Sequence, residues 1–322
     1  ELLEIVREGR FPFCGVEKLG KITYKDFTAK HIEAVYRYPL VDTAAIRAAR
    51  FRVVVDGVNS VGGIIIPALL QTLGVECIKV NCDPTGEFAH NPEPLPQHLK
   101  ELSERVMKEG AHLGISVDPD VDRLALVCED GSFFGEEYTL VSVADYILSQ
   151  RPGPTVSNLS SSRALRDVTE KYGCSYSASA VGEVNVTTEM KRVGAVIGGE
   201  GNGGVIVPDL HYGRDALIGV ALFLSLMAQR GQKPSQIRDS LPQYVISKNK
   251  IELSDTRLIA QVLDGVRSFF ASEKVSTIDG VKIDFEQEKR WVHLRRSNTE
   301  PIIRIYSEAS DKEKADELAS KV

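Results

Sequence analysis

Long hydrophobic runs, basic clusters and paired cysteines are absent from this sequence. No apolar stretch approaches the roughly 20 residues needed to cross a bilayer, so we expect no membrane partner. No block of Lys and Arg interleaves with aromatic residues, and the formal net charge of −6 gives no support to a nucleic-acid surface. The five cysteines are odd in number and lack a C-x-x-C pair, so we interpret them as reduced thiols of a cytoplasmic protein.

The patterns that are present indicate several domains in a chain of 322 residues. A β-branched strand at 51–56, a helix at 64–73 and a strand at 74–80 make a βαβ unit, which predicts a parallel sheet. The glycine-rich turn between the first two completes no phosphate-binding motif, so we interpret it as a simple strand-to-helix turn. After the breaker R-P-G-P at 151–154 a second series of strands and helices begins.

We therefore predict an α/β fold. It consists of tandem three-layer α/β domains with mixed or parallel sheets, followed by a smaller C-terminal α+β domain whose strands alternate apolar and polar residues. The predicted boundaries divide the chain into residues 1–25, 26–134, 135–246 and 247–322.

The most informative run is D-P-D-V-D-R at residues 118–123, in the connection between two buried strands. Three nearby carboxylates repel one another unless a cation lies among them. Oxygen-only ligands favour Mg²⁺ or Ca²⁺ over zinc. Because alternate residues of an extended segment point to opposite faces, the connection must curl, and Pro119 favours such a bend. A solvated acidic turn is the alternative. The candidate metal ligands are Asp118, Asp120 and Asp122.

An EF-hand is a sharper alternative, since Glu129 falls at the twelfth loop position. We reject it because Arg123 occupies the sixth position, where the tight EF-hand turn needs glycine. Strands rather than helices also flank this loop.

Two further segments have ligand-binding character. The run G-G-E-G-N-G-G at 198–204 follows a strand, so backbone can approach a ligand closely while Glu200 and Asn202 offer partners for sugar hydroxyls. A flexible hairpin loop is the alternative. The run R-R-S-N-T-E-P at 295–301 lies between two strands, where a guanidinium, hydroxyls and backbone N–H groups can surround a phosphate. A polar turn is the alternative there.

The segment Y-G-R-D at 212–215 leaves two interpretations open. Arg214 could reach a ligand, or Asp215 could start a helix beside a solvated arginine.

Taken in order, these segments resemble the α-D-phosphohexomutase family, which carries a metal loop, a sugar loop and a phosphate loop on successive domains. The resemblance implies that Asp118, Asp120 and Asp122 bind Mg²⁺, with Arg123 beside the transferred phosphoryl group as the catalytic residue. It implies that Glu200 and Asn202 orient sugar hydroxyls. The implied ligands of the non-reacting phosphate are Arg295, Ser297, Asn298 and Thr299.

The family's first domain, which bears a phosphorylated serine in a T-A-S-H-N-P-like loop, has no counterpart that we recognise here. The run F-A-H-N-P at 88–92 has Ala89 where the serine would be, and it lies where the family has a proline-rich loop. We interpret residues 1–25 as the tail of the first domain and its linker. This chain is accordingly predicted to be inactive alone.

For the intact enzyme the resemblance implies transfer of a phosphoryl group between the 1- and 6-positions of a hexose or hexosamine monophosphate. The route passes through a phosphoserine enzyme and a bisphosphate intermediate. The G-G-E-x-N-G-G form of the sugar loop resembles archaeal phosphoglucosamine mutases, which we favour. Phosphomannomutase/phosphoglucomutase is the first alternative, and a noncatalytic sugar-phosphate-binding protein is the second. The oligomeric state is not predicted.

Overall fold

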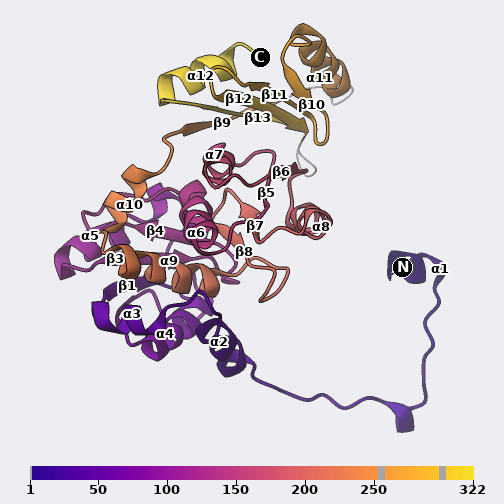
Figure 1. Ribbon diagram of the computed structural model, residues 1–322. Helices are drawn as coiled ribbons and strands as arrows, with labels where there is room; N and C mark the ends of the chain where they lie inside the picture. The colour runs from indigo at the N-terminus through magenta and orange to yellow at the C-terminus, as the bar shows by residue number, and fades with distance from the viewer. Residues whose placement is uncertain (1, 253–257, 297–301) are drawn as a thin grey trace.

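The protein is built on three β-sheets, each formed by one continuous part of the chain (Figure 1). The computed structural model describes residues 2–252, 258–296 and 302–322. Strands β1 to β4 form the first sheet, β5 to β8 the second and β9 to β13 the third. Helices pack on the sheets, so the predicted fold class of tandem α/β units with a C-terminal α+β unit is confirmed.

The first unit has a four-stranded mixed sheet in the order β2-β1-β3-β4. Strand β1 is parallel to both of its neighbours, and β4 is antiparallel to β3. Three successive valines make β1 a strand that is buried along nearly its whole length, as expected for the centre of a parallel sheet. The elements are α2 (Thr28–Tyr36), α3 (Thr43–Ala49), β1 (Arg52–Asp56), α4 (Gly62–Leu73), β2 (Glu76–Val80), η2 (Pro96–His98), α5 (Lys100–Glu109), β3 (Leu113–Val117) and β4 (Leu124–Val127).

The second unit repeats this topology with the strand order β6-β5-β7-β8. Strand β5 is parallel to β6 and β7, and β8 is antiparallel to β7. The elements are α6 (Glu136–Gln150), β5 (Thr155–Asn158), α7 (Ala164–Lys171), β6 (Tyr176–Ser179), α8 (Glu183–Val193), β7 (Ile197–Glu200), β8 (Gly204–Ile206), α9 (Ala216–Arg230) and α10 (Pro234–Ser240).

The C-terminal unit is a five-stranded sheet in the order β10-β11-β12-β13-β9, with every neighbouring pair antiparallel. Helices α11 and α12 pack on this sheet. The elements are β9 (Val245–Glu252), α11 (Leu258–Phe269), β10 (Lys274–Ser276), β11 (Val281–Phe285), β12 (Arg290–Arg296), β13 (Ile302–Ala309) and α12 (Lys312–Ser320).

One apolar core runs through the first two units. Helices α6 and α9 are buried on nearly every side, which suits their apolar sequences. Phe134, at the end of the first unit, meets Phe223 of α9 edge to face with ring centroids 5.1 Å apart. The C-terminal unit has a separate core between its sheet and its helices.

Polar contacts attach the C-terminal unit to the second unit. Arg166 pairs with Glu286 at 2.8 Å, and the buried Lys282 ammonium donates to the Leu159 carbonyl at 2.8 Å. The ring of His293 lies 2.9 Å from the Ser160 hydroxyl, and burial lowers the pKa of this histidine to about 4. The imidazole is therefore neutral at physiological pH.

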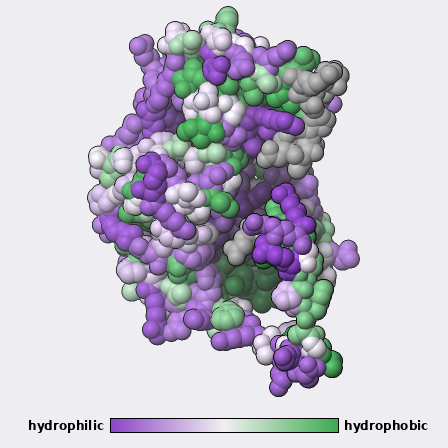
Figure 2. Space-filling view, turned by 90° about the vertical axis from the view of Figure 1, so that its right-hand side faces the viewer, coloured by the Kyte–Doolittle hydropathy of each residue, from purple (hydrophilic) through white to green (hydrophobic). Residues whose placement is uncertain are grey.

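The N-terminal segment runs clear of the three units (Figure 1). It contains α1 (Leu2–Glu8) and η1 (Val16–Lys18), neither of which has a buried residue. On the face shown in Figure 2 hydrophilic residues predominate, with apolar residues scattered among them. In the part of the chain that the structure describes, no helix combines the length and apolar character that a membrane crossing requires.

The strand at the glycine-rich segment 198–204 lies further along the chain than its sequence suggests, since we expected it at 195–197 and β7 begins at Ile197. We expected it to end at Ile197, but β7 continues to Glu200 and pairs with β5 and β8. Glycines weaken strands in isolation. Here Gly199 is held in extended backbone between two neighbouring strands, so sheet pairing outweighs local propensity.

We predict that Phe223→Ala lowers the stability of the first two units, which share one core, more than the stability of the C-terminal unit. The cavity left by the ring should destabilise the first two units by about 3–5 kcal/mol. Guanidinium unfolding would be followed by far-UV circular dichroism and by the fluorescence of Trp291, the only tryptophan, which lies buried in the C-terminal unit. The circular-dichroism midpoint should fall more than the fluorescence midpoint. The exposed Val184→Ala change should alter neither, and equal shifts in both signals for Phe223→Ala would contradict separate cores.

Candidate active site

The acidic connection between β3 and β4 curls back on itself, as its sequence predicts. Val121 adopts a left-handed backbone conformation with a φ of 62°. The Asp118 carboxylate accepts hydrogen bonds from the backbone N–H groups of Asp122 and Arg123, each at 3.0 Å. The loop is therefore organised by its own first carboxylate.

The three aspartates of this loop converge as a metal site requires. One carboxylate oxygen from each of Asp118, Asp120 and Asp122 lies within 4.8 Å of the others. Burial and the neighbouring Asp118 carboxylate raise the pKa of Asp122 to about 7. Asp122 Oδ1 is buried without a hydrogen-bond partner among the described residues. A hard cation bound among these oxygens would reduce the repulsion between the three carboxylates and give Asp122 Oδ1 a partner. The donor set therefore fits Mg²⁺.

Arg123 extends from this loop toward a neighbouring cavity. Its Nε lies 3.5 Å from Asp118 Oδ2, and its Nη1 lies 3.5 Å from Glu93 Oε1. The side chain is half-buried, which leaves part of the guanidinium open to a ligand.

The glycine-rich segment at 198–204, in the second unit, contacts the end of the acidic connection at 118–123. The Gly203 carbonyl accepts a hydrogen bond from the Leu124 N–H at 3.1 Å. Gly203 has a φ of 88°, and a Cβ there would lie 2.4 Å from the Leu124 carbonyl oxygen. Only glycine satisfies both constraints. Both loops follow the carboxyl ends of parallel strands, where α/β proteins bind their ligands.

Glu200 and Asn202 are held differently within this segment. Glu200 is buried, and its Oε1 accepts hydrogen bonds from the Asn158 amide at 2.8 Å and the Gly182 N–H at 3.1 Å. Asn202 Oδ1 accepts the Gly204 N–H at 3.2 Å, and the described residues offer no hydrogen-bond partner to its amide nitrogen, so this group can donate to a ligand.

Arg214 joins the two loops. Its guanidinium pairs with Asp122, with Glu183 at 2.9 Å and with Glu200 at 3.2 Å. Burial would lower the pKa of Arg214, but these carboxylates raise it. A Cβ on Gly204 would lie 2.3 Å from Arg214 Cδ, so the absence of a side chain at 204 makes room for this arginine.

The alternative that Arg214 is a solvated arginine is wrong, because its side chain is only 15% exposed. The helix start at Asp215 is correct, since Asp215 Oδ1 caps α9 by accepting the N–H groups of Leu217 and Ile218. The bridging contacts of Arg214 were missed by sequence reasoning. No local signal at 212–215 indicates them, because Asp122 lies far away in the sequence and comes close only when the first two units pack together.

A polar cavity of about 230 Å³ lies between the three units. Four residues that the motifs singled out line it together: Arg123, Glu200, Asn202 and Arg295. The remaining lining residues are Glu93, Glu136, Glu137, Asn158, Ser160, Val181, Gly201, Lys248, Arg304 and Tyr306.

The third motif is described only in part. Arg295, on β12, is half-buried, and its Nε is buried without a hydrogen-bond partner among the described residues. Ser297, Asn298 and Thr299 lie outside the described residues. Arg295 of β12 pairs in register with Arg304 of β13. Lys248 of β9 pairs with Tyr306, which also lies on β13. These three neighbouring strands therefore bring several cations to the cavity.

Glu137 is a cavity residue that no motif indicated. Burial raises its pKa well above the usual value. Its Oε2 accepts the Ser162 N–H at 2.8 Å, and a Cβ on Gly201 would collide with the same carboxylate. A side chain at 201 would therefore displace the Glu137 carboxylate from its place beside the glycine-rich segment.

The run at 88–92, which has Ala89 where the family's serine would be, contacts the first sheet. His90 Nε2 lies 2.9 Å from Asp56 Oδ2, at the carboxyl end of β1.

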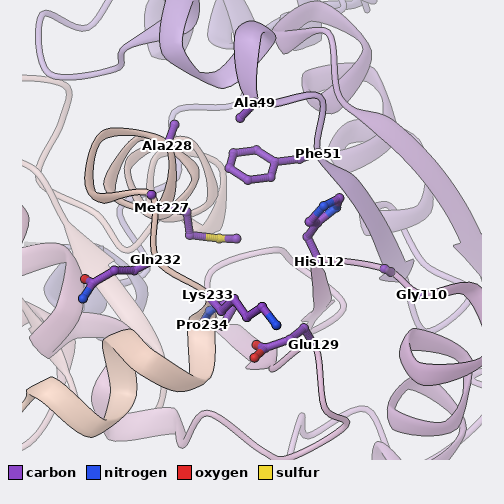
Figure 3. A pocket seen from close by; sticks show the side chains of 12 residues that line it. Ala49, Phe51, Gly110, His112, Glu129, Met227, Ala228, Gln232, Lys233 and Pro234 are labelled. Atoms are coloured by element: carbon purple, nitrogen blue, oxygen red, sulfur yellow. The ribbon is translucent and has the colours of Figure 1, made fainter.

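A second cavity, of about 450 Å³, lies beside the start of β1 and β3 (Figure 3). Phe51 and Met227 contribute apolar surface to it, and Lys233 and Glu129 lie at its edge. Glu129 is already bonded to the Ser235 hydroxyl and N–H. This cavity is at the opposite end of the sheet from the carboxylate loop, so it does not share the predicted chemistry.

Three family models match successive parts of this chain. Residues 29–131 match phosphoglucomutase/phosphomannomutase alpha/beta/alpha domain II, residues 135–244 match domain III, and residues 248–322 match the C-terminal domain. The chain belongs to the phosphoglucomutase/phosphomannomutase family. The predicted resemblance to the phosphohexomutases is thereby confirmed.

Relatives carry the names of two subclasses. A phosphoglucomutase/phosphomannomutase of Thermococcus kodakarensis is 37% identical over 93% of this chain and 65% of its own length. A probable phosphoglucosamine mutase of Methanopyrus kandleri is 32% identical over 98% of this chain and 69% of its own length. The chain thus spans about two thirds of the length of these relatives.

A solved structure shares the whole described architecture. The phosphoglucomutase/phosphomannomutase family protein of Burkholderia thailandensis superposes with a TM-score of 0.82 at 26% identity. The match covers 99% of this chain and 67% of the Burkholderia chain.

We predict that Arg214→Ala destabilises the protein by about 3–5 kcal/mol, because it leaves three carboxylates near one another without their shared cation. Mg²⁺ should recover part of this loss, since a bound cation stabilises the folded state and replaces some of the missing charge. Thermal unfolding with and without Mg²⁺ measures both effects.

Arg192→Ala is the matched control, because Arg192 is an exposed arginine on α8 whose ion-pair partner among the described residues is Glu189 alone. A loss no larger than that of the control, or a Mg²⁺ effect no larger than in the parent chain, would show that Arg214 does not balance these charges.

Proposed function

We propose that this chain forms the metal-, sugar- and phosphate-binding part of a phosphohexomutase. The reaction moves a phosphoryl group between the 1- and 6-positions of a hexose or hexosamine phosphate, through a phosphoserine and a bisphosphate intermediate. The observation that carries the proposal is the shared cavity of Arg123, Glu200, Asn202 and Arg295, with three convergent carboxylates beside it.

In the proposed site, Asp118, Asp120 and Asp122 hold Mg²⁺. Bound there, the ion would offset the negative charge of a phosphoryl group during transfer. Arg123 would contact that phosphoryl group from the same loop. Its charge-assisted hydrogen bonds would position the group, because guanidinium and phosphate geometries are complementary.

The sugar would lie between the second and C-terminal units. Glu200 would accept a hydrogen bond from a sugar hydroxyl through the oxygen that faces Arg214, and Asn202 would donate one through its free amide. Arg295 would bind the non-reacting phosphate, assisted by Ser297, Asn298 and Thr299. Lys248 and Arg304 add positive charge on the same wall of the cavity, which suits a bisphosphate.

Phosphoglucosamine mutase is the subclass that we favour. The sugar loop reads G-G-E-G-N-G-G, the form that resembles archaeal phosphoglucosamine mutases. The Methanopyrus kandleri relative is named a probable phosphoglucosamine mutase. Phosphomannomutase/phosphoglucomutase is the alternative, which the name of the Thermococcus kodakarensis relative supports. We further propose the domain boundaries at 25/26, 134/135 and 246/247 and a cytoplasmic location.

The direct test is a Mg²⁺-dependent mutase assay on the full-length protein with glucosamine, glucose and mannose phosphates. Glucosamine phosphate should give the highest kcat/KM. Asp120→Ala should lower kcat/KM by about 100-fold or more, because several kcal/mol of charge stabilisation depend on the metal and each 1.36 kcal/mol is tenfold. Asp239→Ala, an exposed acidic control, should change nothing. Turnover that is insensitive to both Mg²⁺ and Asp120→Ala would refute the metal-loop role.

The 322-residue chain tested alone should bind sugar phosphate without turning it over, because its family matches are to domains II, III and IV and the similar run at 88–92 has Ala89 in place of the nucleophilic serine. Calorimetric binding of glucose 1,6-bisphosphate and a mutase assay on the same sample distinguish the two properties. Steady turnover by a sample free of any longer form would contradict the prediction. Binding without turnover even in the full-length protein would favour the noncatalytic sugar-phosphate binder.

A further inference from the structure

Outside the cavity, two histidines and one aspartate meet at the junction of the first two units. His31 Nε2 lies 2.9 Å from Asp215 Oδ2, and His211 Nε2 lies 3.1 Å from the same oxygen. The two ring centroids are 5.7 Å apart. One ligand atom from each of the three residues falls within 4.8 Å of the others.

The three side chains come from separate elements that the fold brings together. His31 lies in the first half of α2, in the first unit, whereas His211 and Asp215 lie between β8 and α9 in the second unit. Asp215 Oδ1 caps α9, which fixes the orientation of the carboxylate and leaves Oδ2 for the two imidazoles. Backbone hydrogen bonds that orient a carboxylate in this way are typical of metal ligands.

The donor set differs from that of the carboxylate loop. Two imidazole nitrogens and one carboxylate oxygen are ligands that zinc prefers, while Mg²⁺ prefers oxygens alone. In a tetrahedral zinc site with bonds of about 2.0–2.1 Å, ligand atoms are about 3.3 Å apart. The distances from Asp215 Oδ2 to His31 Nε2, 2.9 Å, and to His211 Nε2, 3.1 Å, therefore need to widen by only a few tenths of an ångström.

A fourth ligand can reach the cluster from solvent. The His31 side chain is 32% exposed and the His211 side chain is 41% exposed, whereas Asp215 is buried. Three protein ligands with one side open to water is the composition of many zinc sites.

We propose that His31, His211 and Asp215 form a binding site for a transition-metal ion of the zinc class, separate from the Mg²⁺ site. The ion would join α2 to the start of α9 and so hold the first two units together. It would also fix the residue next to Arg214, which contacts the carboxylates of both cavity loops. The site goes beyond the proposed mutase function, because none of its three residues lines the cavity.

Zinc titration of this chain in excess Mg²⁺, followed by calorimetry, tests the site. We expect saturable binding of one ion. His31→Gln and His211→Gln should each weaken zinc affinity by at least about tenfold. Loss of a residue that only supports a metal ligand already costs about 10- to 100-fold in affinity, and loss of a ligand itself should cost no less. Asp120→Ala and His98→Gln should leave zinc affinity unchanged, because they alter the carboxylate loop and a histidine outside the cluster.

A second readout reports on the predicted junction. Zinc should slow hydrogen exchange of the backbone amides in α2 and at the start of α9, and it should do so in Asp120→Ala but in neither histidine variant. No saturable zinc binding, or zinc binding lost in Asp120→Ala and retained in both histidine variants, would overturn the proposal and leave a metal-free hydrogen-bonded cluster. Because His211 lies in an exposed loop, its variant remains informative even if His31→Gln fails to fold.

Discussion

The guanidinium of Arg214 is the interaction on which the cavity depends. It contacts a carboxylate of the metal loop, Asp122, together with Glu183 and Glu200 of the second unit. Three carboxylates brought this close without a cation would repel one another strongly in a partly buried setting. Two separate sheets can therefore present their loops to one cavity because the Arg214 guanidinium offsets part of the carboxylate charge of both loops. The hydrogen bond from the Leu124 N–H to the Gly203 carbonyl also fixes the position of one loop relative to the other.

Charge is distributed unevenly around the cavity. Carboxylates lie mainly on the walls formed by the first two units, and the C-terminal unit contributes Lys248, Arg295 and Arg304. Burial would lower the pKa of Lys248, but the neighbouring carboxylate of Glu136 raises it, so this lysine stays charged. A ligand with hydroxyls at one side and a phosphate at the other matches this division, because each end meets groups of suitable charge and hydrogen-bonding capacity.

Sequence patterns identified the parts of this structure that depend on local chemistry. The valine-rich β1, the curled acidic loop and the Asp215 cap follow from residue type and spacing, and the structure contains all three. Long-range contacts were not predictable in the same way. The bridge from Arg214 to Asp122 joins residues 92 positions apart, and the extension of β7 through Gly198 and Gly199 depends on neighbouring strands rather than on the glycines. The approach of Glu137 to Gly201 likewise exists only after two elements have packed together.

Anomalous diffraction from crystals of this chain grown with Mn²⁺ and glucose 1,6-bisphosphate is the most direct test of a single site built from three units. Mn²⁺ is a suitable probe because it prefers the same oxygen ligands as Mg²⁺. We predict an anomalous peak among Asp118, Asp120 and Asp122, one phosphate beside Arg123 and the other beside Arg295. A manganese peak away from these aspartates, or a sugar bound outside the cavity between the three units, would contradict the assignment.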